Sequence, residues 1–176
     1  MIIIAPFEGK IAHLQELLSA RELRASRRKA LAKHYNACVI CVQVNMPGAI
    51  KQNLASEEIF QKAQQTLEET LAMGGYAVLF EQAHMLITGP EGFWVVNAPA
   101  ATIKRDCCKI EQAHKLGRLF DLDVTDAAGH AISRIELGLE PRRCIVCGGP
   151  AADCVSRRLH TLADVQAAIL SILEEI

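Results

Sequence analysis

The 176 residues of this chain suffice for one domain, because a chain of that length buries roughly 70% of the surface that its unfolded form exposes. The hydrophobic fraction is 51%, aromatic residues are few and the formal net charge is −1, which argues against a disordered chain and against a broadly basic nucleic-acid-binding protein. We therefore expect a single domain over residues 1–176 that binds a polyanion only at a local basic patch.

The beginning of the chain and its cysteines bear on where the protein works. Residues 1–6 lack the positive flank and the long apolar core of a signal peptide, and no apolar run reaches the ~18 residues of a membrane span. Seven cysteines, an odd number that includes the adjacent Cys107 and Cys108, do not fit a disulfide framework. We expect a cytoplasmic protein without a membrane segment, whose cysteines are thiols, metal ligands or small core residues.

The first expected elements are a helix and a buried strand. Ser19 and Glu22 match a capping box, which predicts a helix from there to about Tyr35, after a short helical turn over residues 11–18. The small and β-branched residues 37–44 predict a strand that is buried on both sides. Three arginines at helical spacing fall on one face of the first helix: Arg21, Arg24 and Arg28.

Two further helices and two hairpins are expected next. Ser56 can cap a helix that ends at Gly74-Gly75, and residues 100–113 form another. The hairpins follow from strand-forming runs on either side of turn residues. In the first hairpin, the runs 76–80 and 85–88 and the run 93–97 flank a turn at 89–92. In the second, the strands 119–124 and 131–136 flank a turn at 125–129.

Residues 161–175 complete the predicted elements as a closing helix. Its inward side chains at helical spacing are Leu162, Val165, Ile169 and Leu173. Hairpins with helices between them indicate an α+β fold, with a mixed or largely antiparallel sheet and flanking helices.

Two aspartates stand out in the first strand of the second hairpin. Strand alternation places Asp121 and Asp123 on one face, above an apolar underside. Neighbouring carboxylates suit Mg²⁺, which prefers oxygen ligands and shares its shell with substrate phosphates. If the hairpin pairs Asp121 with Arg134, Glu136 lies on the same face as the two aspartates and can become a third ligand of the metal ion. The alternative is an exposed sheet edge with its polar residues outward.

Basic residues elsewhere can hold phosphates, because a guanidinium group is a planar fork with a permanent charge. Besides the three arginines of the first helix, the candidates are Lys51, Arg118, Arg134, Arg142 and Arg143. His114 can orient a substrate or shuttle a proton. The alternatives are charged faces that are only solvated and a structural histidine. No P-loop, dinucleotide fingerprint or serine-hydrolase elbow is present.

A cysteine-rich segment precedes the closing helix. Cys144 and Cys147 are spaced as in a zinc knuckle, and Cys154 and His160 follow, which predicts a tetrahedral, structural Zn²⁺ site. The spacing is looser than in standard zinc ribbons, so the alternative is free thiols that pack as small apolar residues.

Several motifs, spread over most of the chain, form a recognisable combination. They are Arg21-x-x-Arg24-x-x-x-Arg28, Pro47-Gly48-Ala49-Ile50-Lys51, Gly89-Pro90-Glu91-Gly92, residues 114–124, Ser133-Arg134 and Pro141-Arg142-Arg143-Cys144-x-x-Cys147. This combination resembles the holo-acyl-carrier-protein synthases of citrate lyase, also called apo-citrate lyase phosphoribosyl-dephospho-CoA transferases. That family generally has a proline where this chain has Lys115.

The resemblance implies a magnesium-dependent nucleotidyltransferase. Such an enzyme moves a phosphoribosyl-dephospho-CoA unit from triphosphoribosyl-dephospho-CoA to a serine of the apo acyl carrier protein of citrate lyase, and pyrophosphate leaves. Asp121 and Asp123 would hold Mg²⁺. Arg118 and Lys51 would balance phosphate charge, and the arginine face of the first helix would hold the outer phosphates or the carrier protein.

Two other hypotheses remain open at this point. One keeps the chemistry but makes the chain a related transferase that serves another carrier protein. The other treats residues 144–160 as a zinc-containing interaction module without catalysis, which zinc content without nucleotide binding would favour. Such a module would present a surface to a protein or an RNA, but the near-neutral net charge and the few aromatic residues count against RNA, so we expect neither a nucleic acid nor a membrane as partner.

Overall fold

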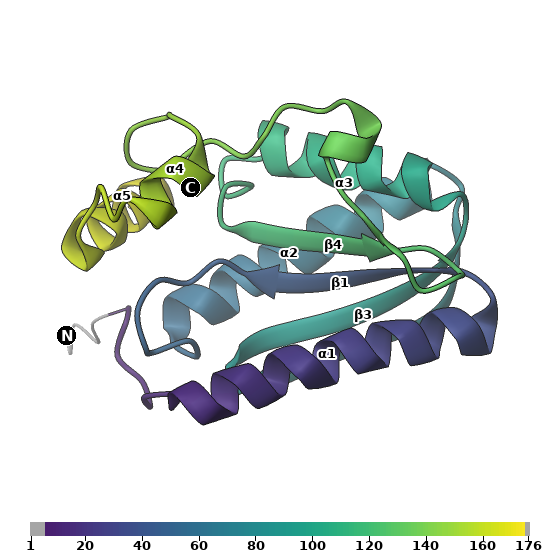
Figure 1. The fold of residues 1–176 in the computed structure, drawn as a ribbon, viewed down its shortest axis with the longest axis horizontal. Coiled ribbons are helices and arrows are strands. Elements are labelled where there is room, and N and C mark those ends of the chain that lie inside the picture. Colours follow the sequence, from purple (N-terminus) through teal and green to yellow (C-terminus); the bar gives the residue numbers. More distant parts are fainter. Residues whose placement is uncertain (1–5, 175–176) are drawn as a thin grey trace.

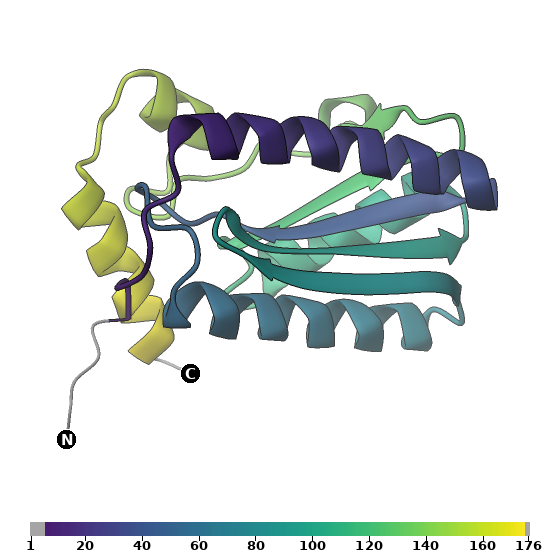
Figure 2. The ribbon, with the colours of Figure 1, turned by 90° about the horizontal axis from the view of Figure 1, so that it is seen from below.

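The computed structural model describes residues 6–174 as a five-stranded sheet with helices on both faces (Figure 1). One long helix covers one face of the sheet and two others cover the opposite face, as the view from below shows (Figure 2). In chain order the elements are α1 (Leu14–Tyr35), β1 (Cys38–Val44), α2 (Leu54–Met73), β2 (Ala77–Leu86), β3 (Gly89–Asn97), α3 (Ala100–Ala113), β4 (Phe120–Thr125), β5 (Ala131–Ile132), the 3-10 helix η1 (Ile135–Leu137), α4 (Ala151–Ser156) and α5 (Leu162–Glu174).

All neighbouring strands of the sheet are antiparallel, in the order β2-β3-β1-β4-β5. β1 is therefore the central strand, and the burial of its first five residues confirms the prediction of a strand covered on both sides. The larger part of the core lies between the sheet and helices α2 and α3, and the smaller part lies under α1. The predicted α+β fold with an antiparallel sheet is confirmed.

The structure also bears on the cysteines and on the helices. The seven cysteines are all free thiols, and Cys38, Cys41, Cys107 and Cys108 are buried among core residues. None of the helices within residues 6–174 has both the length and the apolar character that a bilayer crossing requires.

The first helix begins one turn earlier than the sequence predicts. Instead of a short turn followed by a helix capped at Ser19, α1 is continuous from Leu14. The reason is Glu16, whose carboxylate accepts the backbone N–H of His13 at 2.7 Å and so satisfies the helix N-terminus there. Likewise α2 begins after Asn53, and the predicted cap Ser56 is its reciprocal partner in a capping box.

The turn of the first hairpin lies at residues 87–88, so the prediction of a turn at 89–92 is wrong. Those four residues instead begin β3. Gly92 has no side chain because the ring of Trp94 occupies that space, and a Cβ there would lie 2.5 Å from the ring. The tight turn is made possible by Gly89, whose φ of +104° is a conformation that side chains rarely adopt.

The second hairpin is much shorter than predicted. β5 pairs with β4 only through Val124↔Ile132 and Thr125↔Ala131, so the pairing of Asp121 with Arg134, the condition for Glu136 to join the aspartates, does not form. Side chains of α3 take the place of the missing strand. Lys104 Nζ donates to the carbonyl of Leu122 at 2.8 Å, and the N–H of Leu122 donates to Glu111 at 2.9 Å.

This substitution of side chains for a strand predicts a stability effect. Lys104→Met should lower the free energy of unfolding by about 2 kcal/mol, because the Leu122 carbonyl loses a charge-assisted hydrogen bond in a buried place. The matched control is Lys109→Met on the same helix, whose exposed ion pair with Asp106 should contribute far less to stability. Urea unfolding of both variants measures the difference, and equal stabilities would contradict the assigned role of Lys104.

The closing helix α5 confirms most of the inward face predicted for it. Ile169 is fully buried, and Val165 and Leu173 pack against the main core. Leu162 was expected inward but is 49% exposed, because it lies in the first turn, beyond the edge of the core. The last predicted residue of the helix, Glu175, and residues 1–5 lie outside the described residues.

Candidate active site

The carboxylates Glu91, Asp121 and Asp123, here called the carboxylate row, lie on the face of the sheet that α1 partly covers. In the antiparallel register Asp121 lies opposite Gln43 and Asp123 opposite Cys41. Gln43 in turn lies opposite Glu91 on the other side of β1. The period-two pattern of β4 thus places the two aspartates together, as predicted. The pairing of β1 with β3 brings Glu91 to the same row, a residue that the sequence analysis named only as part of a motif.

Two arginines of α1 reach down to the carboxylate row. Arg24 forms an ion pair with Glu91 at 3.1 Å, and Arg28 forms one with Asp123 at 2.9 Å. Both side chains are at least four-fifths buried, whereas Arg21, one turn earlier, is exposed. The predicted arginine face is therefore divided between a buried pair that neutralises carboxylates and an exposed residue.

Arg27, between these two arginines, was not among the predicted residues. Its guanidinium lies 4.9 Å from the ring centre of Phe93 and contacts Gln82 and His84 of β2. It therefore fixes α1 against β2 and β3.

The surroundings of Asp121 change the pKa of its carboxyl group. Partial burial and the charge of Asp123 raise the pKa of Asp121, although Arg142 acts in the opposite direction. Arg142 Nη1 lies 3.2 Å from a carboxylate oxygen of Asp121. Two adjacent carboxylates with one raised pKa form a site where a proton or a further cation is favoured.

Glu111 organises the opposite side of β4, and nothing in the sequence distinguished it. Its side chain is 3% exposed and accepts the N–H of Leu122. It also forms ion pairs with Arg134 and, at 2.6 Å, with Arg142. Arg142 therefore bridges Glu111 and Asp121 and donates to the carbonyl of Phe120 as well. Glu111 positions a predicted arginine against a predicted aspartate.

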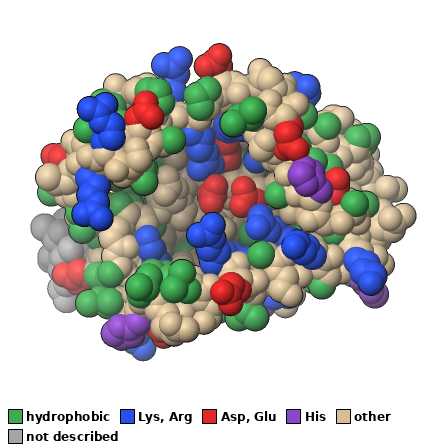
Figure 3. Space-filling view, in the orientation of Figure 1, with side chains coloured by type: hydrophobic (Ala, Val, Ile, Leu, Met, Phe, Trp, Pro, Cys, Tyr) green, Lys and Arg blue, Asp and Glu red, His purple; other side chains and the backbone are tan. Residues whose placement is uncertain are grey.

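A cavity of about 750 Å³, here called the basic cavity, opens beside this bridge. It is lined by five of the predicted basic residues, namely Lys51, Arg118, Arg134, Arg142 and Arg143. Figure 3 shows acidic side chains at the floor of a hollow over β1 and β4, with basic side chains around it. The carboxylate row and the basic cavity thus lie next to each other, and this combination suits a polyphosphate that carries a metal ion.

Arg118 is the group in the cavity with the clearest capacity for an anion. Its Nη2 atom is buried and has no hydrogen-bond partner within the described residues. Burial and the nearby charge of Arg142 lower the pKa of Arg118. Gly117 allows the preceding loop to approach α3, because a Cβ there would lie 2.6 Å from the carbonyl oxygen of Glu111. An anion at Arg118 would relieve both the unmet hydrogen bond and the repulsion.

Lys51 lies in the same wall and is similarly placed for an anion. Its Nζ donates to the carbonyl of Met46 at 2.5 Å, and burial lowers the pKa of the amine.

His114 and Glu136 are not brought to the carboxylate row. His114 ends α3, its Nδ1 accepts the N–H of Leu116 at 3.0 Å, and its ring packs on Phe120 on the opposite face of the sheet. Burial and the charge of Lys62 lower its pKa. The carboxylate of Glu136 instead accepts hydrogen bonds from His130 at 2.7 Å and from the N–H of Ser133 at 2.6 Å, because the chain turns into η1 rather than continuing as a strand.

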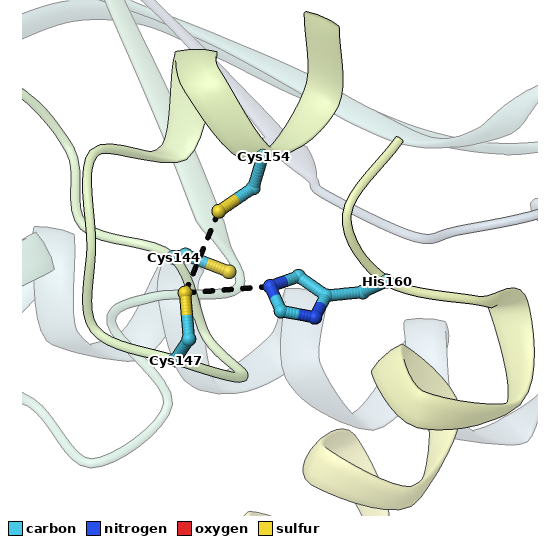
Figure 4. Close-up of side chains that lie close together, drawn as sticks. All are labelled: Cys144, Cys147, Cys154 and His160. Atoms are coloured by element: carbon cyan, nitrogen blue, oxygen red, sulfur yellow. Dashed lines mark hydrogen bonds between the residues drawn. The ribbon is translucent and has the colours of Figure 1, made fainter. Parts of the chain in front are cut away.

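The cysteine-rich segment brings together the four residues that the sequence grouped, here called the metal-ligand cluster: Cys144, Cys147, Cys154 and His160. Their ligand atoms all lie within 4.8 Å of one another, and the side chains point inward (Figure 4). Although burial acts in the opposite direction, hydrogen bonds from the backbone of Cys147 and Val146 lower the pKa of the Cys144 thiol to about 7. The cluster can hold a metal ion.

Comparisons with known proteins agree on one family. The family model described as "Apo-citrate lyase phosphoribosyl-dephospho-CoA transferase" matches residues 12–176. A Vibrio cholerae protein named "Probable apo-citrate lyase phosphoribosyl-dephospho-CoA transferase" is 37% identical over 157 residues, which cover 89% of this chain and 88% of the relative.

Two further relatives are similar over nearly the whole chain. An "Apo-citrate lyase phosphoribosyl-dephospho-CoA transferase" of Shigella flexneri is 32% identical over 163 residues, covering 93% of this chain and 89% of the relative. "Protein CitXG" of Haemophilus influenzae is 32% identical over 167 residues, which are 95% of this chain but 36% of that longer protein.

Proposed function

This chain belongs to the family of apo-citrate lyase phosphoribosyl-dephospho-CoA transferases, and from that membership we propose that it is an enzyme that attaches phosphoribosyl-dephospho-CoA to apo-citrate lyase. The observation that carries the proposal is the family match over residues 12–176. That range includes the carboxylate row, the basic cavity and the metal-ligand cluster.

The donor that fits this reaction is triphosphoribosyl-dephospho-CoA, and the acceptor is a serine of the acyl carrier protein of apo-citrate lyase. The serine oxygen forms a bond to the α-phosphorus of the donor, while the bond from that phosphorus to the outer two phosphates breaks. Pyrophosphate leaves with the electron pair of the broken bond, and the serine proton passes to a base. The product is a phosphodiester between the carrier and the ribosyl-dephospho-CoA unit.

Asp121 is the residue we assign as the base. Arg28 pairs with its neighbour Asp123 at 2.9 Å, whereas Arg142 lies 3.2 Å from Asp121, so Asp121 is the less tightly paired of the two carboxylates. No residue of the chain has to attack the donor. Cys41, the nucleophile nearest in register to Asp123, is 1% exposed, and burial raises the pKa of its thiol to about 12.

The donor set of Asp121 and Asp123 fits Mg²⁺, because it offers carboxylate oxygens on one face and leaves positions for substrate phosphates. When bound, Mg²⁺ would supply positive charge that offsets the charge on the phosphates during transfer. In this structure Arg28 forms an ion pair with Asp123, and Arg142 forms one with Asp121.

The basic cavity beside the carboxylate row is the site that we assign to the phosphates of the donor. Arg118 and Lys51 lie in its wall and are the groups that we assign to the α-phosphate and the leaving pyrophosphate. The exposed Arg21 and Arg143 extend the positive surface outward, where the acidic surface typical of a carrier protein could dock.

The metal-ligand cluster suits Zn²⁺, since three cysteines and one histidine form a closed tetrahedral set for that ion. We assign it a structural role, because such a site leaves no open position for a substrate.

The test is transfer to the purified carrier protein. The full chain, incubated with triphosphoribosyl-dephospho-CoA, Mg²⁺ and the apo acyl carrier protein of citrate lyase, should add the mass of one phosphoribosyl-dephospho-CoA unit to the carrier serine. Intact-protein mass spectrometry measures the product, and a carrier with that serine replaced by alanine is the control. Folded enzyme that gives no mass gain would overturn the proposal.

A further inference from the structure

The metal-ligand cluster and the basic cavity share residues. Cys144, Cys154 and His160 supply three of the four ligand side chains and also line the cavity. Lys51, which precedes α2, and Arg118, which precedes β4, line the same cavity. A metal ion at the cluster would therefore lie in the wall of the cavity.

The ligand atoms are spaced as a tetrahedral zinc ion requires. The sulfurs of Cys147 and Cys154 are 3.5 Å apart, and Nε2 of His160 is 3.3 Å from the sulfur of Cys147. A zinc ion with Zn–S bonds of ~2.3 Å separates two sulfurs by about 3.8 Å. The three thiols and the imidazole point at a common centre from three different parts of the chain (Figure 4).

Arg142 ties the beginning of the segment that carries this cluster to Glu111 and to the Phe120 carbonyl, and Ile145 packs against the main core, but the rest of the segment has little core of its own. Of residues 141–160, only Cys154 is buried. The hydrogen bonds that Cys144 makes close the loop on itself, as in the 2.6 Å bond from its N–H to the carbonyl of Gly149. Apolar side chains such as Val155, 78% exposed, contribute little core. A bound metal would join the loop, α4 and the start of α5, which is how metal binding stabilises small elements.

The segment contributes both charged and apolar groups to its side of the cavity. Arg143 and Arg158 provide the charge, and Ile145 and Val155 provide the apolar surface. Arg118 and Lys51 line the same space, and the volume of about 750 Å³ is typical of small-molecule sites. This chemistry suits a nucleoside diphosphate with a long uncharged arm, which is the shape of the CoA-derived donor.

We propose that a zinc ion at Cys144, Cys147, Cys154 and His160 fixes the outer wall of the donor-binding cavity, so that binding of the dephospho-CoA part of the donor depends on the metal. The zinc takes no part in the transfer. It acts by positioning Arg143, Arg158 and the apolar side chains of the segment in the lining of the cavity. This inference rests on the proposed function, since that function names the donor.

The test measures metal content and ligand binding separately from activity. Zinc per chain is measured by elemental analysis of the purified full chain, and titration calorimetry measures its affinity for dephospho-CoA without Mg²⁺. We expect about one zinc per chain. Cys147→Ser and His160→Gln should lose the zinc and weaken dephospho-CoA binding by roughly tenfold or more, the effect of losing one charge-assisted contact. His130→Gln, which changes an exposed histidine outside the cluster, should change neither.

Each outcome decides the matter. Adding Zn²⁺ to chelator-treated wild type should restore binding, and adding Mg²⁺ should not. A chain that binds no zinc, or a zinc-free chain that binds dephospho-CoA as well as the loaded one, would overturn the inference. If the zinc-loaded chain fails to bind dephospho-CoA but still transfers the prosthetic group to the carrier, the inference fails and the proposed function survives.

Discussion

Asp121→Asn should lower the rate of transfer to the carrier protein by about 100-fold or more, the usual loss when a group that stabilises a transition state is removed. The substitution keeps the shape of the side chain and an oxygen that can accept from Arg142. It removes the charge that a metal ion needs and the basicity that the serine proton needs. Asp123→Asn should have a comparable effect, with the added loss of the ion pair to Arg28.

The matched control for these variants is Asp126→Asn. Asp126 follows the same strand and accepts the N–H of His130 at 2.8 Å, which an asparagine oxygen can also do. Mass spectrometry of the carrier after single turnovers measures the rates, and thermal unfolding verifies the fold. Asp121→Asn should stay folded, because it also removes the repulsion between Asp121 and Asp123. Wild-type rates in both site variants would refute the assignment of the carboxylates.

The second large effect is expected at Glu111, and it is an effect on stability. Glu111→Ala should lower the free energy of unfolding by about 3–5 kcal/mol, because it leaves Arg134 and Arg142 without their buried partner and the N–H of Leu122 without an acceptor. Urea unfolding measures the loss. Transfer activity should fall in the same variant even where it is folded, since Arg142 loses the carboxylate that holds it beside Asp121.

Glu69→Gln is the control for this prediction. Glu69 is exposed on α2 and accepts a hydrogen bond only at the surface, from Gln65 at 2.9 Å, so its replacement should cost less than about 0.5 kcal/mol. A milder variant, Glu111→Gln, keeps the protein folded if alanine does not. Stability of Glu111→Gln and Glu111→Ala close to that of Glu69→Gln would contradict the bridging role of Glu111.

The parts of the site that could be predicted are those that a local period determines. Asp121 and Asp123 alternate with buried Leu122 and Val124, so their common face follows from strand geometry alone. The spacing of Arg24 and Arg28 on a helix likewise placed them on one face, and both reach carboxylates of the row.

The parts that could not be predicted depend on partners distant in sequence. Glu91 joins the carboxylate row because β3 pairs with β1, and Glu111 matters because Arg142 connects it to Asp121. Neither contact leaves a local pattern in the sequence. The second hairpin was predicted too long because side chains of α3 replace the missing backbone partner of Leu122. The first turn was misplaced because Gly92 makes room for Trp94, and a glycine required by packing has the same letter as one required by a turn.

The position of β1 at the centre of the sheet has a consequence for how the protein is made. Its two partners lie far downstream, since Cys38 pairs with Val96 and Val39 pairs with Thr125. While the chain emerges from the ribosome, β1 therefore remains an apolar strand with both edges open until most of the polypeptide has been synthesised. The β2–β3 hairpin can form earlier from neighbouring residues, and β4 completes the sheet later. A chain stalled after α3 would hold every helix that flanks the sheet, yet it would expose the edge that β4 covers and could associate with other nascent chains there.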